Sequence, residues 1–596
     1  MQINRHLVAL AIAGLFGTTG CTLSKMIKMA KDQELTVKPS PLELHGDSVK
    51  WELSAKLPLK MLKKNKMYSV ASTYKYSDQK VALPELVLKQ VDYPKANVEQ
   101  PLASRKYGFL YTGETMSPGD LVITGIAANM NNVQKKTPEM TIARGIITTS
   151  RLVQDVYSPI YAPHGYNNSE ELAPTNVNFF FEQGSSKLRV TETKGGRGSF
   201  LTKFISRKNP TKTVVITGYH SPEGKEVRNV KLSEERAKAI EKFYKESMKQ
   251  YKYAKKADSI QFVTRSVVEN WKVFKDSLAV YPGLSQEQKD EVKNLIDNST
   301  DNFVVTEEKL SKLACYPEIF TGLYPKLRTA NTEILDIMPK KSDATISLLA
   351  KGITEGREQP TALNDRELGY AATMTPLLNE REAIYRAATK KNDSWETHNN
   401  LGAVLLEQAK KLSGKDRKDM ADKAIIQLEI AKNKEPNATV SANLATAYLM
   451  KGDLANAAVA VANGTQLQPN EAARRTLNTV GGILLIKQGK YTGAVNNLSA
   501  GVEDAVVSFD RGLAYLLNRD FDKAVTNFEE SVTANPNYAP SYYGLAIAAA
   551  RRKQDKPFID NLKKAIAIDD NLRARALGDM EFYEYFGSEA FRNAIK

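Results

Sequence analysis

The pattern of apolar and polar residues divides the chain into regions with different periodicities. From residue 49 to about 155 apolar positions recur every second residue, as in Trp51, Leu53 and Ala55, which alternate with polar residues. A period of two places one face of a strand inward and the other in water. Further short runs of this kind follow, separated by turn-forming residues. Six or seven strands at this spacing predict a β-sandwich of immunoglobulin-like type over residues 46–158.

The middle of the chain alternates strand-like and helix-like segments. The runs VNFFF at 177–181 and VVITGY at 214–219 are typical of buried strands. A long amphipathic helix follows, and Ser233 is a good candidate for its N-cap. This order predicts an α+β domain over residues 174–353, with a helical insertion and a closing strand at 345–349.

From residue 360 to 596 the pattern is helical throughout and repeats itself. Small residues recur in the first helix of each unit, at Gly402, Ala445, Gly482, Gly512 and Gly544. Small residues let paired helices approach closely, and prolines end three of the units. The pattern resembles the tetratricopeptide repeat, which has a period of about 34 residues. We expect an all-α solenoid with units starting near 395, 438, 475, 505 and 537, then a capping helix through 572–595.

A stack of such helix pairs leaves a concave face. The resemblance implies that this face binds peptides or partner proteins. The candidate partner-binding residues on the first helices are Asn399, Asn443, Tyr448, Asn478 and Tyr515. Packing or solvation is an equally good interpretation of any one of them.

The N-terminus has the pattern of an export signal. Arg5 precedes the apolar run 7–16, which is too short to span a hydrocarbon core of ~30 Å as a helix and has the length found in signal peptides. Small residues then lead into Cys21. This order resembles a bacterial lipobox, which implies a signal peptide at 1–20, lipid on Cys21 and a lipidated tether over 21–45. The alternative is an ordinary cleaved signal with an incidental cysteine.

The residues after Cys21 bear on the membrane and its face. Thr22 stands where an aspartate would retain a lipoprotein in the inner membrane, by resemblance to sorting in didermal bacteria. An acidic cluster accompanies surface display in Bacteroidota-like lipoproteins, and none follows Cys21. These resemblances imply an outer-membrane lipoprotein that faces the periplasm.

Bulk composition agrees with an exported globular protein. Of 596 residues, 42% are hydrophobic and 26% are charged, which is ordinary for folded domains. The net charge of +16 favours anionic surroundings such as lipid phosphate or anionic wall polymer. Nucleic acid is the other usual partner of a basic chain, but export to the envelope argues against it.

Three segments of the middle region carry a further resemblance. They are FEQGSSKL at 181–188, VITGYHSPEG at 215–224 and NVKLSEERAKAI at 229–240. Together they resemble the OmpA-like, peptidoglycan-associated domain. The resemblance implies a peptidoglycan groove lined by Ser221, Glu223, Asn229 and Arg236.

In that family a loop aspartate takes the ammonium of diaminopimelate, and a helix arginine takes its carboxylate. Arg236 matches this arginine. Ser221 occupies the aspartate position and carries no negative charge, so Glu223, two residues on, is the candidate for the ammonium group.

No motif of catalysis accompanies these regions. The five histidines are scattered, and the sequence has no metal-ligand spacing, phosphate loop, Gly-x-Ser-x-Gly motif or dinucleotide fingerprint. We therefore expect no enzyme activity, no metal and no cofactor. The leading hypothesis is a non-catalytic scaffold lipoprotein that links the outer membrane to peptidoglycan, to protein partners or to both. The alternative is a structural subunit of an envelope machine for secretion, gliding motility or surface-appendage assembly, without peptidoglycan binding.

Overall fold

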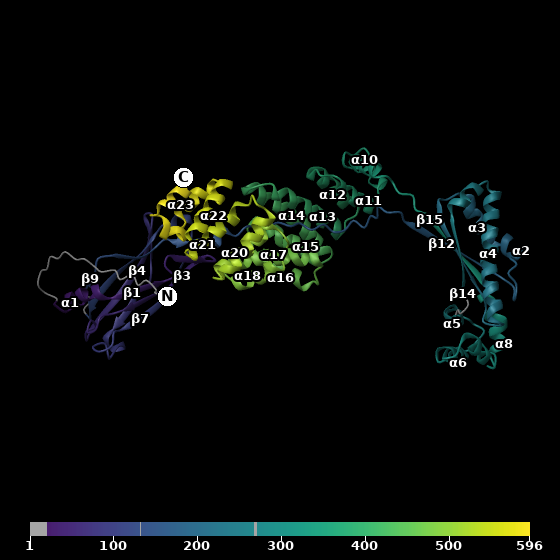
Figure 1. The fold of residues 1–596 in the computed structure, drawn as a ribbon, viewed down its shortest axis with the longest axis horizontal. Helices are drawn as coiled ribbons and strands as arrows, with labels where there is room; N and C mark the ends of the chain where they lie inside the picture. Colours follow the sequence, from purple (N-terminus) through teal and green to yellow (C-terminus); the bar gives the residue numbers. More distant parts are fainter. Residues whose placement is uncertain (1–20, 131–132, 268–270) are drawn as a thin grey trace. The chain divides into compact units, whose positions relative to one another are not determined.

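Figure 1 shows a computed structural model of the chain, which describes residues 21–130, 133–267 and 271–596. The predicted signal peptide at 1–20 lies outside these residues. The chain divides into two compact units. The first combines the residues up to His164 with Ser347–Lys596, and the second is Gly165–Ile346. The β-rich region and the helical repeats, which the sequence pattern presents as separate domains, therefore belong to one unit.

The described strands of the β-rich region form two sheets over a shared core. One sheet has the order β1 (Glu34–Lys38), β3 (Ser48–Lys56), β2 (Leu42–His45) and β11 (Ile146–Ile147), with β7 (Leu102–Leu110) on β3. The other has the order β10 (Met140–Arg144), β8 (Asp120–Asn129), β4 (Lys66–Tyr76) and β5 (Gln79–Ala82), with β6 (Leu86–Lys89) on β4 and β9 (Gln134–Lys136) on β8. In β3 the predicted alternation holds, since Trp51 and Leu53 are buried and Lys50 is exposed. A β-rich N-terminal region is confirmed, and its immunoglobulin-like type stays a prediction.

The tether predicted over 21–45 is folded in the structure, which corrects the expectation of an extended linker. This stretch folds into α1 (Cys21–Met29), the 3₁₀ turn η1 (Ala30–Asp32), β1 and β2. Leu23, Met26 and Ala30 are buried in the core between the sheets. Their spacing matches one face of a helix, so burial of that face outweighs the freedom of an extended tether. Cys21 therefore directly begins a folded element.

The second unit contains a four-stranded sheet among its described residues, with the order β12, β15, β13, β14. The strands are β12 (Leu172–Phe180), β13 (Thr211–Tyr219), β14 (Gln261–Val267) and β15 (Thr329–Ile337). The same domain contains the helices α2 (Val190–Lys194), α3 (Gly196–Ser206) and α4 (Glu226–Gln250). Helix α4 connects the parallel strands β13 and β14. Phe179, Ile216 and Ile240 share the core of this domain.

A helical insertion separates β14 from β15. It contains α5 (Trp271–Ala279), α6 (Gln286–Asp297), α7 (Phe303–Leu310), α8 (Tyr316–Glu318), the π-helical turn η6 (Ile319–Leu323) and α9 (Tyr324–Leu327). The insertion has its own apolar cluster, in which Phe274 and Tyr324 are fully buried. Cys315 is buried there too.

Two predictions in this unit are wrong. The closing strand is β15, whereas residues 345–349 lie in helix α10 (Asp343–Thr354). The polar Thr332, which is fully buried in β15, hides the alternation of that strand in the sequence. Ser233 is not an N-cap, because α4 begins at Glu226 and the Ser233 hydroxyl donates to the carbonyl of Asn229 at 2.9 Å, inside the helix.

The C-terminal region is a stack of antiparallel helix pairs. In order they are α11 (Asp365–Met374) with α12 (Leu378–Lys391), α13 (Trp395–Lys410) with α14 (Gly414–Lys434), α15 (Ala438–Lys451) with α16 (Leu454–Gln466), α17 (Glu471–Lys487) with α18 (Tyr491–Ser499), α19 (Ala505–Leu517) with α20 (Phe521–Ala534), and α21 (Ala539–Arg551) with α22 (Asp555–Ile568). A Cβ atom on Gly512 or Gly544 would lie 2.7 Å from the ring of Phe528. Small residues are therefore needed where these helices touch, as predicted.

The helical stack differs from the prediction at both ends. The pair α11 and α12 precedes the predicted first unit. The predicted capping helix over 572–595 is broken into α23 (Asn571–Gly578), the 3₁₀ turn η8 (Met580–Tyr585) and α24 (Glu589–Ala594). Among the described residues, no helix has the length and apolar character needed to cross a membrane.

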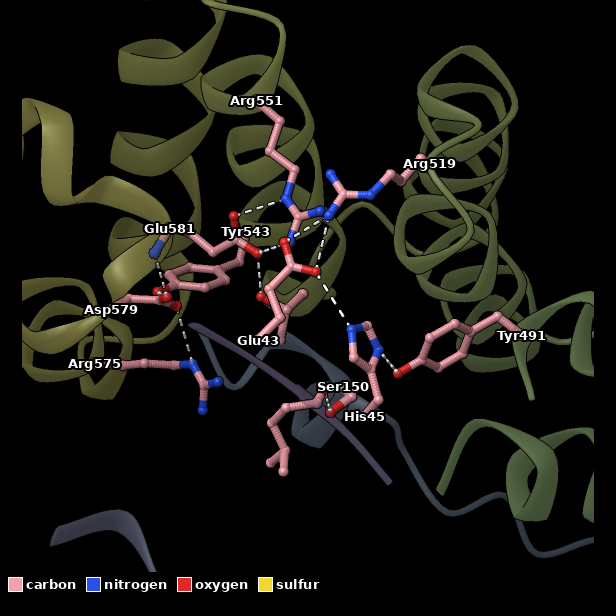
Figure 2. Close-up of polar contacts among 12 residues, drawn as sticks. Glu43, His45, Ser150, Tyr491, Arg519, Tyr543, Arg551, Arg575, Asp579 and Glu581 are labelled. Atoms are coloured by element: carbon pink, nitrogen blue, oxygen red, sulfur yellow. Dashed lines mark hydrogen bonds and ion pairs between the residues drawn. The ribbon is translucent and has the colours of Figure 1, made fainter. Parts of the chain in front are cut away.

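A network of ion pairs joins the β-rich region to the last repeats, and in it the Arg519 side chain is exposed whereas those of Glu43, Arg551 and Glu581 are largely buried (Figure 2). Arg519, just after α19, donates through Nη2 to both carboxylate oxygens of Glu43 on β2 at 2.9 Å. Arg551, at the end of α21, donates to Glu581 in η8 through Nε at 2.8 Å and Nη2 at 2.6 Å. Its Nη2 also lies 3.9 Å from Glu43 Oε1. Glu581 is 1% exposed and Arg551 11% exposed, so each charge depends on its partners.

The pKa of Glu43 reflects this environment. Burial by itself would raise the pKa, but the hydrogen bond with His45 and the charges of Arg551 and Arg519 outweigh burial and lower it. His45 in turn lies 2.9 Å from the hydroxyl of Tyr491 (Figure 2). The carboxylate of Glu43 is thus held in its charged form by His45 on the same strand and by two arginines from the repeats.

Apolar contacts continue the same junction. Leu152, in the 3₁₀ turn η4 (Thr149–Leu152), packs into the core of the last repeats with Phe509 and Phe528. Gly145 has a φ of +69°, and a Cβ atom there would lie 2.5 Å from Met580. Glycine is therefore required at this position both for its backbone conformation and for the close approach.

We expect Arg551→Met to lower the free energy of unfolding of this unit by about 3–5 kcal/mol, because Glu581 and Glu43 would lose a buried counter-charge. Urea denaturation followed by circular dichroism measures the loss. Arg519→Met is the matched control, since the Arg519 side chain is 58% exposed and should contribute less than about 1 kcal/mol. Equal losses in the two variants would contradict the role given to the buried arginine.

Candidate functional site

The four predicted groove residues of the second unit lie around one loop. Ser221 and Glu223 follow the end of β13, whereas Asn229 and Arg236 project from α4. The Asn229 side chain closes the loop by donating to the carbonyl of Glu223 at 3.0 Å. Gly224 has a φ of +96°, which suits glycine at this turn. The sequence prediction therefore identifies residues that are neighbours, and their ligand stays a prediction.

Arg236 is enclosed by the backbone of the unit. It is 1% exposed, and its guanidinium donates to the carbonyls of Ser185 at 3.0 Å, Tyr219 at 2.7 Å and Glu182 at 3.1 Å. Burial, aided by the nearby charge of Arg328, lowers the pKa of Arg236 to about 10. The guanidinium thus fixes α4 to the chain that follows β12 and to the end of β13.

Glu223 is paired with an arginine that the sequence analysis missed. Arg328 lies between α9 and β15, is 6% exposed, and donates to Glu223 Oε1 through Nη2 at 2.8 Å and Nε at 3.0 Å. The same Nε lies 3.0 Å from the hydroxyl oxygen of Ser221. An internal cation therefore stands where the resemblance places the ammonium of a ligand. Arg328 is remote in sequence from the loop, so no local pattern points to it.

His220 follows the end of β13 and contacts this loop. Its Nδ1 lies 2.7 Å from the carbonyl oxygen of Ser221, and its ring packs edge-on against Phe303 at 6.0 Å. Among the residues that the structure describes, no group of three His, Cys, Asp or Glu side chains could hold a metal ion. What this loop offers is hydrogen bonding and charge.

A second candidate site is the inner side of the helical repeats, where Asn399 on α13 and Asn443 on α15 are fully buried. Asn443 accepts from the backbone N–H of Ile160 at 2.8 Å and donates to its carbonyl at 2.7 Å. Asn399 donates to the same carbonyl at 3.0 Å. Both predicted residues therefore contact a peptide, and that peptide is the chain's own segment after the β-rich region.

Further residues on the first helices contact this segment and were missed. Asn400 on α13 accepts from the N–H of Ala162 at 2.6 Å and donates to its carbonyl at 3.1 Å. Asp510 on α19 accepts from the N–H of Gln154 at 2.9 Å, and burial raises its pKa well above the ordinary value. A signal existed: Asn400, Asn443 and Asp510 each stand two residues before the small residue of their helix.

The other predicted candidates make contacts within the repeats. The Asn478 side chain donates to the carbonyl of Ala500 at 3.1 Å. The Tyr448 hydroxyl donates to Glu429 at 3.2 Å, and the ammonium of Lys523 lies 5.5 Å from the ring centre of Tyr515. Their role in binding a partner stays a prediction.

The comparisons with known proteins agree with this architecture. Residues 180–265 match the OmpA family. The loop residues 221–236 lie inside this match, and Arg328 lies outside it. No curated protein matches the chain. The middle of the chain is therefore an OmpA domain, and a helical region that resembles a tetratricopeptide solenoid follows it.

The repeats are similar to several solved structures. YrrB, a TPR protein with an unusual peptide-binding site, is 18% identical over 32% of this chain and 98% of its own, with a TM-score of 0.27. PilW, a type IV pilus biogenesis factor, is 17% identical over 33% and 99%, with a TM-score of 0.26. A tetratricopeptide repeat protein of Parabacteroides merdae is 12% identical over 42% and 96%, with a TM-score of 0.27. At such scores the assignment of this region rests on its own helix pairs.

We expect Arg236→Ala to destabilise the OmpA domain by roughly 3 kcal/mol or more, because a buried charged donor and its three hydrogen bonds to backbone carbonyls would be lost. Hydrogen exchange measured peptide by peptide separates this unit from the other. Arg228→Ala is the matched control on the same helix, since Arg228 is exposed and should change stability by less than about 0.5 kcal/mol. Unchanged protection of β12 and β13 in the Arg236 variant would contradict a structural role.

Proposed function

We propose that the protein is a non-catalytic scaffold of the bacterial envelope. Cys21 carries lipid, the chain is anchored in an outer membrane of Bacteroidota type facing the periplasm, and the repeats hold other envelope proteins. The observation that carries the proposal is the buried junction between β2 and the last repeats, through Glu43, Arg551 and Glu581. It makes the repeats one body with the domain that begins at the lipidated residue.

The two forms of the scaffold hypothesis differ in whether the OmpA domain binds the wall. OmpA domains commonly bind peptidoglycan. In this chain the guanidinium of Arg236 is used by three backbone carbonyls, and Glu223 Oε1 is used by Arg328. Buried groups that are already paired gain little from a ligand. These contacts favour a structural subunit of an envelope machine, in which the OmpA domain serves as a folded spacer or docking domain.

Lipidation is tested by growing cells with radiolabelled palmitate. We expect the wild-type chain to incorporate label and to partition with membranes, because acyl chains on Cys21 supply the predicted membrane anchor. Cys21→Ser should lose both properties, and Cys315→Ser is the matched control. Label in the Cys21→Ser variant, or its continued partition with membranes, would contradict the anchor.

Wall binding is tested by sedimentation of the purified chain, without its lipid, with isolated sacculi. We expect it to stay in the supernatant while a peptidoglycan-binding OmpA domain sediments. Glu223 Oε2 has no hydrogen-bond partner among the described residues, so Glu223→Gln is the variant to compare. If the wild type sediments and Glu223→Gln does not, the wall-linked form replaces the one proposed here.

If the protein is a structural subunit of an envelope machine, it should also have a fixed set of protein partners. Crosslinking in cells followed by mass spectrometry should recover one set of envelope proteins in fixed proportion to this chain. A broad set without fixed proportions would contradict it.

A further inference from the structure

The segment at residues 152–164 lies in extended form along the inner helices of the repeats. It runs from α19, where Gln154 bonds Asp510, past α15, where Ile160 bonds Asn443, to α11, where the His164 ring lies 5.5 Å from that of Tyr370. The segment therefore crosses the repeats in the direction opposite to their order in the sequence. It occupies the face on which a solenoid of this kind would hold a peptide.

Most of the hydrogen bonds between the repeats and the segment are made to backbone groups of the segment. The N–H groups of Gln154, Ile160 and Ala162 and the carbonyls of Ile160 and Ala162 are bonded by side chains of the first helices. Two asparagines also bond each other, since Asn443 donates to Asn399 at 2.9 Å. Contacts to backbone groups do not depend on side-chain identity, so another extended peptide could make them.

Three side chains of the segment add selectivity. Asp155 pairs with Lys487 on α17 at 3.0 Å. The ring of Tyr157 lies 5.6 Å from the guanidinium of Arg417. The ring of Tyr161 stacks on Tyr385 at 5.7 Å. An acidic residue, a tyrosine two positions on and a second tyrosine four positions later are thus the features that the groove recognises.

The chemistry of the groove is that of a binding surface and not of a permanent core. Asn399, Asn443 and Asp510 are fully buried beneath the segment, whereas positions that are always buried are normally apolar. Polar groups of this kind can be hydrated when the segment leaves. Asp510 Oδ2 has no hydrogen-bond partner among the described residues, so the resident segment does not use everything that the groove offers.

We propose that the inner groove of the repeats is an extended-peptide site occupied by the chain's own segment 152–164, and that a partner protein binds there by displacing this segment with a peptide of the same chemistry. Such a peptide is extended and carries the pattern Asp-x-Tyr-x-x-x-Tyr. The inference rests on the proposed protein-binding role of the repeats and specifies the partner. A tethered segment acts at an effective concentration on the order of millimolar, so a free peptide competes only weakly with it.

The test uses the whole mature chain and a fluorescein-labelled peptide of residues 151–165. In a release variant, Tyr157→Ala with Tyr161→Ala, the segment loses its aromatic anchors while the groove is unchanged. We expect the labelled peptide to bind the release variant at least roughly tenfold more tightly than the wild type. Adding Asn399→Ala and Asn443→Ala should abolish this binding, whereas adding Arg474→Ala should leave it unchanged. Arg474 is the matched control, because it is exposed on α17 and pairs with Glu471.

Hydrogen exchange tests the proposal on the wild-type chain directly, so the result does not depend on whether a variant folds. The amides of Ile160 and Ala162 should exchange slowly in the wild type and at the rate of a free peptide in the release variant. Fast exchange in the wild type would overturn the proposal, as would equal peptide binding by the wild type and the release variant. A released but folded variant that binds no peptide would overturn it too. These assays need neither lipid nor wall, so failure of the envelope role would leave their result unaffected.

Discussion

The pairing of buried charges between β2 and the last repeats is the constraint on which the first unit depends. Glu43 and Glu581 come from opposite ends of the chain, and Arg551 lies between them. A charge removed from water is tolerated only where its counter-charges are in place. Neither end of the unit can therefore complete this junction alone. The second unit, Gly165–Ile346, is inserted into the sequence of the first and does not interrupt the junction.

The same requirement explains the state of the two candidate sites. In the second unit Arg328, which lies outside the OmpA match, supplies the positive charge that Glu223 needs, and backbone carbonyls use the guanidinium of Arg236. In the repeats the backbone of Ile160 satisfies Asn399 and Asn443. At both sites, polar groups that could bind a ligand are bonded to other parts of the same chain instead. The difference is that Arg328 is buried in its own unit, whereas residues 153–164 have no regular structure and are held mainly by side chains of the repeats.

Local patterns predicted much of the fold and part of the sites. The period-two alternation of β3 and the small residues at Gly512 and Gly544 follow from burial of one strand face and from close helix contact. The errors occurred where a tertiary contact changed the meaning of a local pattern. Ser233 is a residue type that often caps helices, but it lies within α4. The apolar face of α1 is explained only by the sheets that cover it. In β15 a buried threonine concealed the strand.

The sequence by itself determined the order of a β-rich region, an OmpA domain and helical repeats, because each is encoded by a short-range period or motif. It also named Arg236, Asn399 and Asn443 as candidate binding residues. Only the tertiary structure decided what these residues contact. Arg328 and segment 152–164 are far from them in the chain, and hydrogen bonds between distant residues leave no periodic trace in a sequence. For the same reason, the union of the first and last regions into one unit became visible only in three dimensions.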